Sequence, residues 1–137
     1  MPRMFTGWRR DQRGQSMVEF GLASVVFFSL IFGIIQFGRA VFQYNTVSSL
    51  AQEGARWASV HGSTSDSPGT AAQLQSYVEG RSPGFSVTVT ATPANPSAVA
   101  PGTVVSVRVV SSFNPAVNLI PSATLSLEST AKMIVTR

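Results

Sequence analysis

The feature that most constrains this chain is an uncharged apolar run at residues 20–38, FGLASVVFFSLIFGIIQFG. A bilayer core about 30 Å thick needs roughly 20 helical residues, so the run is long enough to cross a membrane once. A cleavable secretory signal has a shorter apolar core that ends in small residues, whereas this run continues into RAVFQY. A buried core helix of a soluble protein is the weaker alternative, because the run is long and its N-terminal flank is basic. The sequence therefore predicts one transmembrane helix.

Basic residues are concentrated before this run. Four of the ten Lys and Arg residues lie in the first thirteen positions, and the other six are dispersed. The net charge of +4 is therefore an orientation signal and does not predict nucleic-acid binding. We expect a single-pass protein of the cytoplasmic membrane, with its N-terminus in the cytoplasm and its C-terminal domain outside. The single Arg39 beyond the run does not reverse this orientation, which is set by Arg3, Arg9, Arg10 and Arg13.

An acidic residue, Glu19, stands at the edge of the apolar run. A carboxylate at this place is costly and usually has a partner. Its position alone leaves two alternatives. Glu19 either reaches water at the membrane interface or pairs with a positively charged or hydrogen-bonding group, which the position does not identify.

The residues around Glu19 resemble the processing site of type IV prepilins. The stretch RGQSMVEF at 13–20 combines a basic leader that ends in glycine with an acidic residue, an aromatic residue and an apolar helix. The resemblance implies that a prepilin peptidase cuts after Gly14, which makes Gln15 the first mature residue. Glu19 then becomes the fifth mature residue and Phe20 the sixth.

More narrowly, the chain resembles the TadE-like proteins of the tight-adherence (Flp) pilus system. Three blocks carry the resemblance: RGQSMVEFGL at 13–22, FGIIQFGRAVFQY at 32–44 and AQEGARWA at 51–58. It implies a minor pilin or pseudopilin and no catalytic residues. The implied partners are the prepilin peptidase, other pilins or pseudopilins, pilus assembly proteins and the lipid bilayer. After processing, the protein is expected in an extracellular pilus or in the membrane.

Cleavage would give Glu19 a partner. It creates a free amine on Gln15, which can pair with Glu19 of a neighbouring subunit inside an apolar filament core. An unpaired buried charge costs several kcal/mol, on the order of 3–5. We therefore expect Glu19, together with Phe20, to set the axial register between subunits.

Helical spacing continues beyond the apolar run and predicts one long helix over about 16–60. The small residues Gly54, Ala55 and Ala58 allow close approach of another element, which is either the chain's own sheet or another subunit. A short helix is expected at 70–80, with Thr70 as its N-cap.

The pattern then changes to alternation, which predicts three strands at about 85–92, 103–110 and 124–135. The expected apolar face of the third strand includes Leu125 and Leu127. The connection 111–123, SSFNPAVNLIPSA, either closes one end of the core or forms a patch that faces a partner or the membrane. Together these elements predict an α+β fold, in which a long N-terminal transmembrane α-helix continues into a small domain with a short helix and a three-stranded antiparallel sheet.

This pattern divides the chain into four parts. They are a basic leader (1–14), a transmembrane helix (15–38), its extramembrane continuation (39–61) and a small α+β domain (62–137).

The residue inventory gives little support for an enzyme. Cysteine is absent, and there is one histidine, so we expect no catalytic residues, metal or cofactor. An alternative function is an uncleaved single-pass membrane-anchored adaptor or binding module outside the cytoplasm. The two functions differ in whether the chain is cleaved after Gly14.

Overall fold

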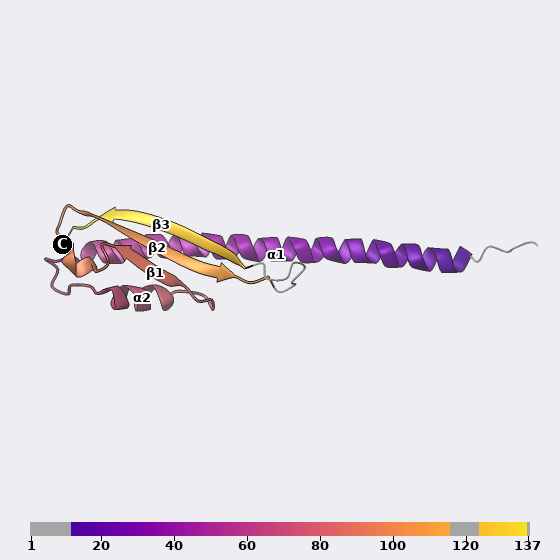
Figure 1. The fold of residues 1–137 in the computed structure, drawn as a ribbon, viewed down its shortest axis with the longest axis horizontal. Coiled ribbons are helices and arrows are strands. Elements are labelled where there is room, and N and C mark those ends of the chain that lie inside the picture. Colours follow the sequence, from indigo (N-terminus) through magenta and orange to yellow (C-terminus); the bar gives the residue numbers. More distant parts are fainter. Residues whose placement is uncertain (1–11, 116–123, 137) are drawn as a thin grey trace, which may run out of the picture. The chain divides into compact units, whose positions relative to one another are not determined.

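The computed structural model describes residues 12–115 and 124–136 and divides the chain into two compact units, Met1–Ile35 and Gln36–Arg137. The long helix α1 contributes to both units, and every other described element belongs to the second (Figure 1). The predicted α+β fold is confirmed. The elements are α1 (Gln12–Val60), α2 (Ala71–Glu79), β1 (Thr88–Thr92), the 3₁₀ helix η1 (Pro96–Ala98), β2 (Val104–Phe113) and β3 (Leu125–Ile134).

The described part of the first unit is helical, and its apolar side chains are exposed along the whole apolar run. Its two serines are hydrogen-bonded within the helix. Ser24 Oγ donates to the Phe20 carbonyl at 2.8 Å, and Ser29 Oγ donates to the Val25 carbonyl at 2.7 Å. Because these hydroxyls are satisfied locally, they do not need water, which suits a helix inside a bilayer.

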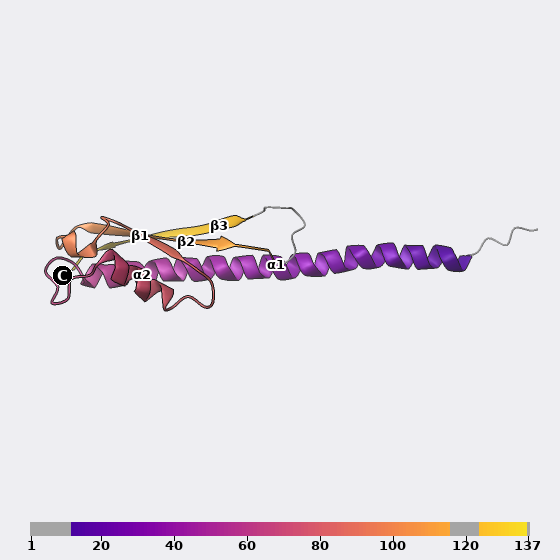
Figure 2. The ribbon, with the colours of Figure 1, turned by 60° about the horizontal axis from the view of Figure 1, so that its bottom comes forward.

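The second unit contains an antiparallel sheet in the order β1-β2-β3, which Figures 1 and 2 show from two sides. Val107 of the central strand lies opposite Ala91 on one neighbour and Ala131 on the other. The alternation predicted for the second strand is confirmed, because Val105, Val107 and Val109 are completely buried.

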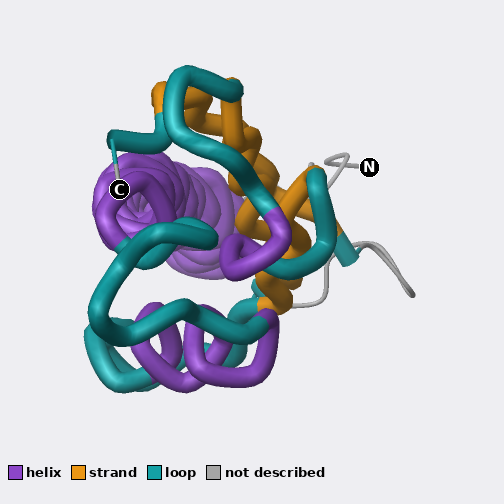
Figure 3. The backbone as a smooth tube through the Cα atoms, turned by 90° about the vertical axis from the view of Figure 1, so that its left-hand side faces the viewer, coloured by secondary structure: helices purple, strands orange, loops and turns teal. Residues whose placement is uncertain are grey.

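The C-terminal half of α1 packs with this sheet and with α2. Figure 3 shows α1 end-on beside the strands, with α2 below it. The three elements meet at Gly54, where an added Cβ would lie 3.2 Å from Val107 Cγ1, 3.2 Å from Val78 Cγ2 and 3.6 Å from Leu74 Cδ1. Around Gly54, α1 buries mostly small side chains: Val47, Leu50, Ala51, Ala55 and Ala58. The absence of bulk on this face of α1 permits the close packing.

Helix α2 begins as predicted. The Thr70 side chain accepts a hydrogen bond from the Gln73 amide, and the Gln73 side chain accepts one from the Thr70 amide, which completes a capping box. Gln75 then joins α2 to the β1 region. Its amide nitrogen donates to the Val87 carbonyl at 2.9 Å, and its oxygen accepts from the Val89 amide at 2.7 Å.

The strand boundaries differ from the prediction at one end of the sheet. β1 begins at Thr88, and β2 runs on to Phe113, into the segment predicted as a connection. β2 continues because Ser111 and Phe113 keep the inward alternation and are buried. Leu125 was expected on the buried face but is 55% exposed, because it lies at the end of an edge strand. The rest of the predicted connection, 116–123, lies outside the described residues.

Candidate processing and assembly site

The predicted processing site lies in the first turns of α1. Gly14 and Gln15 are among the first described residues of α1, which spans Gln12–Val60. Both residues are exposed, and a Cβ added to Gly14 would meet nothing within 4 Å. Glycine also favours the helix less than alanine by about 1 kcal/mol. The Gly14–Gln15 bond is therefore exposed and lies beside a residue that favours the helix poorly.

Gln15 and Glu19 lie one helical turn apart on the same face. Together with Gly14, Val18 and Leu22, they line a shallow hollow on that face of the helix. Glu19 is exposed. The spacing places its carboxylate one turn from the nitrogen that cleavage after Gly14 would release as an amine.

The surface around Glu19 is strongly apolar and exposed. Met17 is 79% exposed and Phe20 is 76% exposed. α1 is long and apolar enough to cross a membrane, and none of its most apolar 18-residue window is buried within the chain. An exposed apolar surface of this extent indicates contact with lipid or with other helices. A long apolar N-terminal helix of this kind fits membrane anchoring.

The predicted orientation signal falls mostly outside the described residues. Arg3, Arg9 and Arg10 precede residue 12, and although Arg13 lies in α1, its side chain is not described. The membrane orientation therefore stays a prediction.

The small residues of α1 face the interior of the second unit. Ala55 and Ala58 are fully buried in its core cluster, and Gly54 contacts α2 and β2 as described above. The neighbouring Trp57 is partly buried against the same cluster. Its ring stacks on His61 with 4.0 Å between the ring centroids, and His61 Nδ1 lies 2.7 Å from the Trp57 carbonyl oxygen. These contacts give the one histidine a structural role.

No metal-binding cluster of three or more His, Cys, Asp or Glu residues occurs in the described part of the chain.

Sequence analysis missed a buried polar residue, Gln43. Gln43 is only 9% exposed. Its amide nitrogen donates to Ser111 Oγ at 2.8 Å and to the Ser112 carbonyl at 3.2 Å, and Ser111 Oγ donates to the Ser86 carbonyl at 2.9 Å. Gln43 lies one turn before the buried Val47, so extending the packing stripe backwards would have found it.

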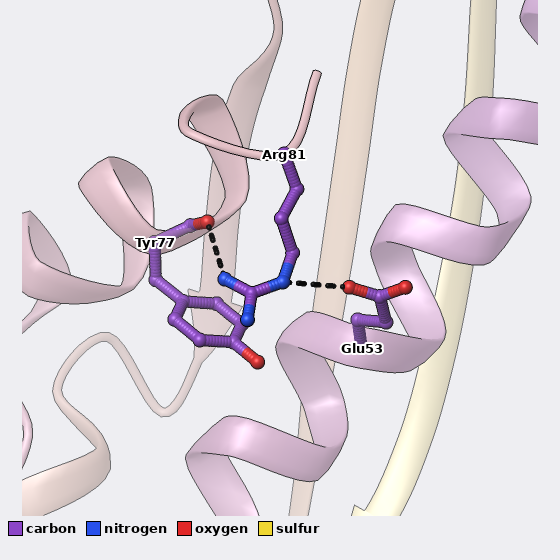
Figure 4. Close-up of polar contacts among 3 residues, drawn as sticks. All are labelled: Glu53, Tyr77 and Arg81. Atoms are coloured by element: carbon purple, nitrogen blue, oxygen red, sulfur yellow. Dashed lines mark hydrogen bonds and ion pairs between the residues drawn. The ribbon is translucent and has the colours of Figure 1, made fainter. Parts of the chain in front are cut away.

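A surface contact between α1 and the end of α2 was also missed. The Arg81 guanidinium lies 3.8 Å from the centroid of the Tyr77 ring, and Arg81 Nε is 3.1 Å from Glu53 Oε2 (Figure 4). Arg81 also donates to the Tyr77 carbonyl at 3.4 Å. The sequence spacing of Arg81 and Tyr77 indicates a contact within one turn, but nothing in it indicates Glu53.

These features define a class: a chain with one apolar N-terminal helix suited to membrane anchoring and a small α+β domain that packs on the continuation of that helix. Residues 14–56 match the family model described as TadE-like protein. The predicted resemblance to TadE-like proteins is thereby confirmed over these residues. The match includes Gly14, Glu19 and the apolar run, and it ends before α2 and the sheet. No curated protein and no solved structure shows a significant match to the chain.

Proposed function

We propose that this protein is a minor pilin-like or pseudopilin-like component that is cleaved after Gly14 and assembles through its exposed apolar helix. One observation carries the proposal. Within the segment that matches the TadE-like family, the apolar surface of α1 includes one carboxylate, Glu19, one turn beyond the accessible Gly14–Gln15 bond.

Cleavage after Gly14 requires a prepilin peptidase to reach the Gly14–Gln15 bond. That bond is exposed, and local unwinding there costs little because Gly14 favours the helix poorly. The peptidase is therefore the first proposed partner. The leader, residues 1–14, stays in the cytoplasm, residues 15–38 cross the membrane, and residues 39–61 and 62–137 lie outside.

Cleavage also changes the electrostatics of the helix end. The new Gln15 amine places a positive charge at a helix N-terminus, which already carries about half a positive charge from the peptide dipoles. The nearest acidic side chain along the mature chain is Glu19, because residues 15–18, QSMV, include no acidic residue. Pairing of this amine with Glu19 of a neighbouring subunit neutralises both groups in an apolar filament core and gives the subunits a defined axial offset.

The mass of the mature N-terminal peptide tests the processing step. We expect the chain from cells to begin at Gln15, and the Gly14→Ala variant, or deletion of the peptidase, to leave the leader attached. Recovery of an intact leader from wild-type cells would instead support the membrane-anchored adaptor. A Gly14→Ala chain that still begins at Gln15 would refute cleavage governed by this glycine.

Substitution of Glu19 tests the assembly step separately. Glu19→Gln removes the charge with little change in size, and Glu53→Gln is its matched control in the second unit. We expect Glu19→Gln to be cleaved but lost from the sheared-fibre fraction, while Glu53→Gln enters fibres normally. Normal assembly of Glu19→Gln would contradict the role of Glu19 in the register.

A further inference from the structure

We propose that one end of the second unit sits in the lipid headgroup layer, so that the folded domain rests on the membrane surface. The lipid-facing surface consists of exposed residues around α1 and at the adjacent end of the sheet: Phe37, Arg39, Val41, Phe42, Tyr44 and Leu125. All of them belong to the unit Gln36–Arg137.

The position of this surface follows from the chain itself. The uncharged run ends at Gly38, and Arg39 is the first charged residue after it. If residues 20–38 cross the hydrocarbon core, Arg39 lies at its boundary, where a guanidinium can reach lipid phosphates. The proposal thus rests on the membrane anchoring of α1 but not on cleavage at Gly14.

The sheet reaches the same level as Arg39. The Arg39 guanidinium lies 6.0 Å from the centroid of the Phe113 ring, at the last residue of β2. Phe113 is paired in register with Leu125, the first residue of β3. One turn beyond Arg39, the buried hydrogen bonds from Gln43 to Ser111 and Ser112 hold this end of β2 to α1. The end of the sheet is therefore fixed beside the first residues after the apolar run.

The chemistry of the exposed residues matches a lipid interface. Tyr44 is 50% exposed, and tyrosine is enriched at the level of lipid headgroups because its ring is apolar and its hydroxyl is polar. The apolar Phe42 is 62% exposed and suits the adjacent edge of the hydrocarbon core. From Phe37 to Tyr44 the helix rises about 10 Å at 1.5 Å per residue. Each headgroup region is roughly 5–8 Å thick. The residues thus extend from the edge of the hydrocarbon core through the headgroup layer.

Because the chain has no cysteine, single reporter cysteines can test this placement. Leu125→Cys carries an environment-sensitive fluorophore in the full-length protein, reconstituted in nanodiscs of phosphatidylethanolamine and phosphatidylglycerol. The matched control is Thr130→Cys, an exposed position on the same strand, roughly 16 Å further along it. Lipids that carry a spin-label quencher near the headgroup report contact with the bilayer, and aqueous iodide reports contact with water.

We expect the label at position 125 to be blue-shifted and quenched by the spin-labelled lipids, and the label at 130 to be quenched by iodide. Equal iodide quenching at both positions would overturn the proposal. Protection of position 125 in sheared fibres but not in nanodiscs would also overturn it, because a neighbouring subunit would then be the occupant. The uncleaved and cleaved chains should behave alike, so failure of the processing proposal leaves this test intact.

Discussion

The two halves of α1 form one continuous helix but carry opposite kinds of surface. Before residue 36 the helix exposes large apolar side chains, such as Phe20 and Leu22, along its whole described length. From Gln43 onwards the packing face is mostly small and is buried against the chain's own sheet and α2; it includes Val47, Leu50, Ala51, Gly54, Ala55 and Ala58.

The comparison shows that side-chain size determines which surface each half of the helix can pack against. Small residues let the sheet come close enough to form a dense core. The large residues of the first half have no such partner in the described chain, and the serines among them satisfy their own hydroxyl groups. This half is therefore suited to lipid or to other apolar helices.

The largest expected effect comes from Leu74→Ala, which empties a buried position of the second unit. Leu74 is 1% exposed, so we expect a loss of about 2–5 kcal/mol in the free energy of unfolding. Leu22→Ala makes the same change on the exposed half of α1 and should leave that free energy nearly unchanged. Denaturant unfolding of the detergent-solubilised full chain, followed by Trp57 fluorescence in a Trp8→Phe background, measures both. Equal losses would break the distinction between the two halves.

Enlarging a glycine should sharpen the same distinction. Gly54→Leu forces a side chain against Val78 and Val107, and we expect a destabilisation of about 1–3 kcal/mol. Gly33 has open space around it, so Gly33→Leu should gain up to about 1 kcal/mol of helix propensity. The unfolding assay and the helical circular dichroism signal report the two outcomes. A tolerated Gly54→Leu would show that the packing between α1 and the sheet is looser than described.

Removing the buried amide of Gln43 tests the connection between α1 and the end of β2. Gln43→Ala leaves Ser111 Oγ and the Ser112 carbonyl without this donor, and we expect a cost of about 1–3 kcal/mol. The exposed Gln52→Ala is the matched control and should have little effect. Amide hydrogen exchange at the end of β2 should increase in the Gln43 variant alone. Unchanged exchange would mean that the hydrogen bond does not hold this strand end.

The smallest effect is expected at the exposed pair Arg81 and Glu53. Their side chains are 47% and 50% exposed, so a double-mutant cycle with Arg81→Ala and Glu53→Ala should give a coupling of about 0.2–1 kcal/mol. The coupling should fall as salt screens the charges. A coupling that is larger and insensitive to salt would indicate a contact more enclosed than the structure shows.

The sequence alone predicts features that depend on local pattern. The apolar run, the Thr70 cap and the inward valines of β2 all follow from residue spacing, and the structure confirms them. The GQSMVEF motif also predicts the candidate site, although its role is still a proposal. Other contacts depend on residues far apart in the chain. The Gln43–Ser111 hydrogen bond spans 68 positions. The helical period extended back from Val47 places Gln43 on the inward face, but nothing in the sequence indicates Ser111 as its partner. The exposure of Leu125 at the end of β3 likewise depends on how far the rest of the domain covers the sheet, which the strand's own pattern does not indicate.

The central claim, that other apolar groups cover the first half of α1 in the cell, is tested most directly by thiol labelling. Single cysteines replace Phe20, Phe27 and Ile34 in the apolar half and Gln52 and Thr130 in the second unit, and intact cells and sheared fibres are treated with a membrane-impermeant maleimide. The thiolate is the reactive form, and it is disfavoured in apolar surroundings. We expect labelling at 52 and 130 and protection at 20, 27 and 34. Equal labelling at all five positions would contradict the claim.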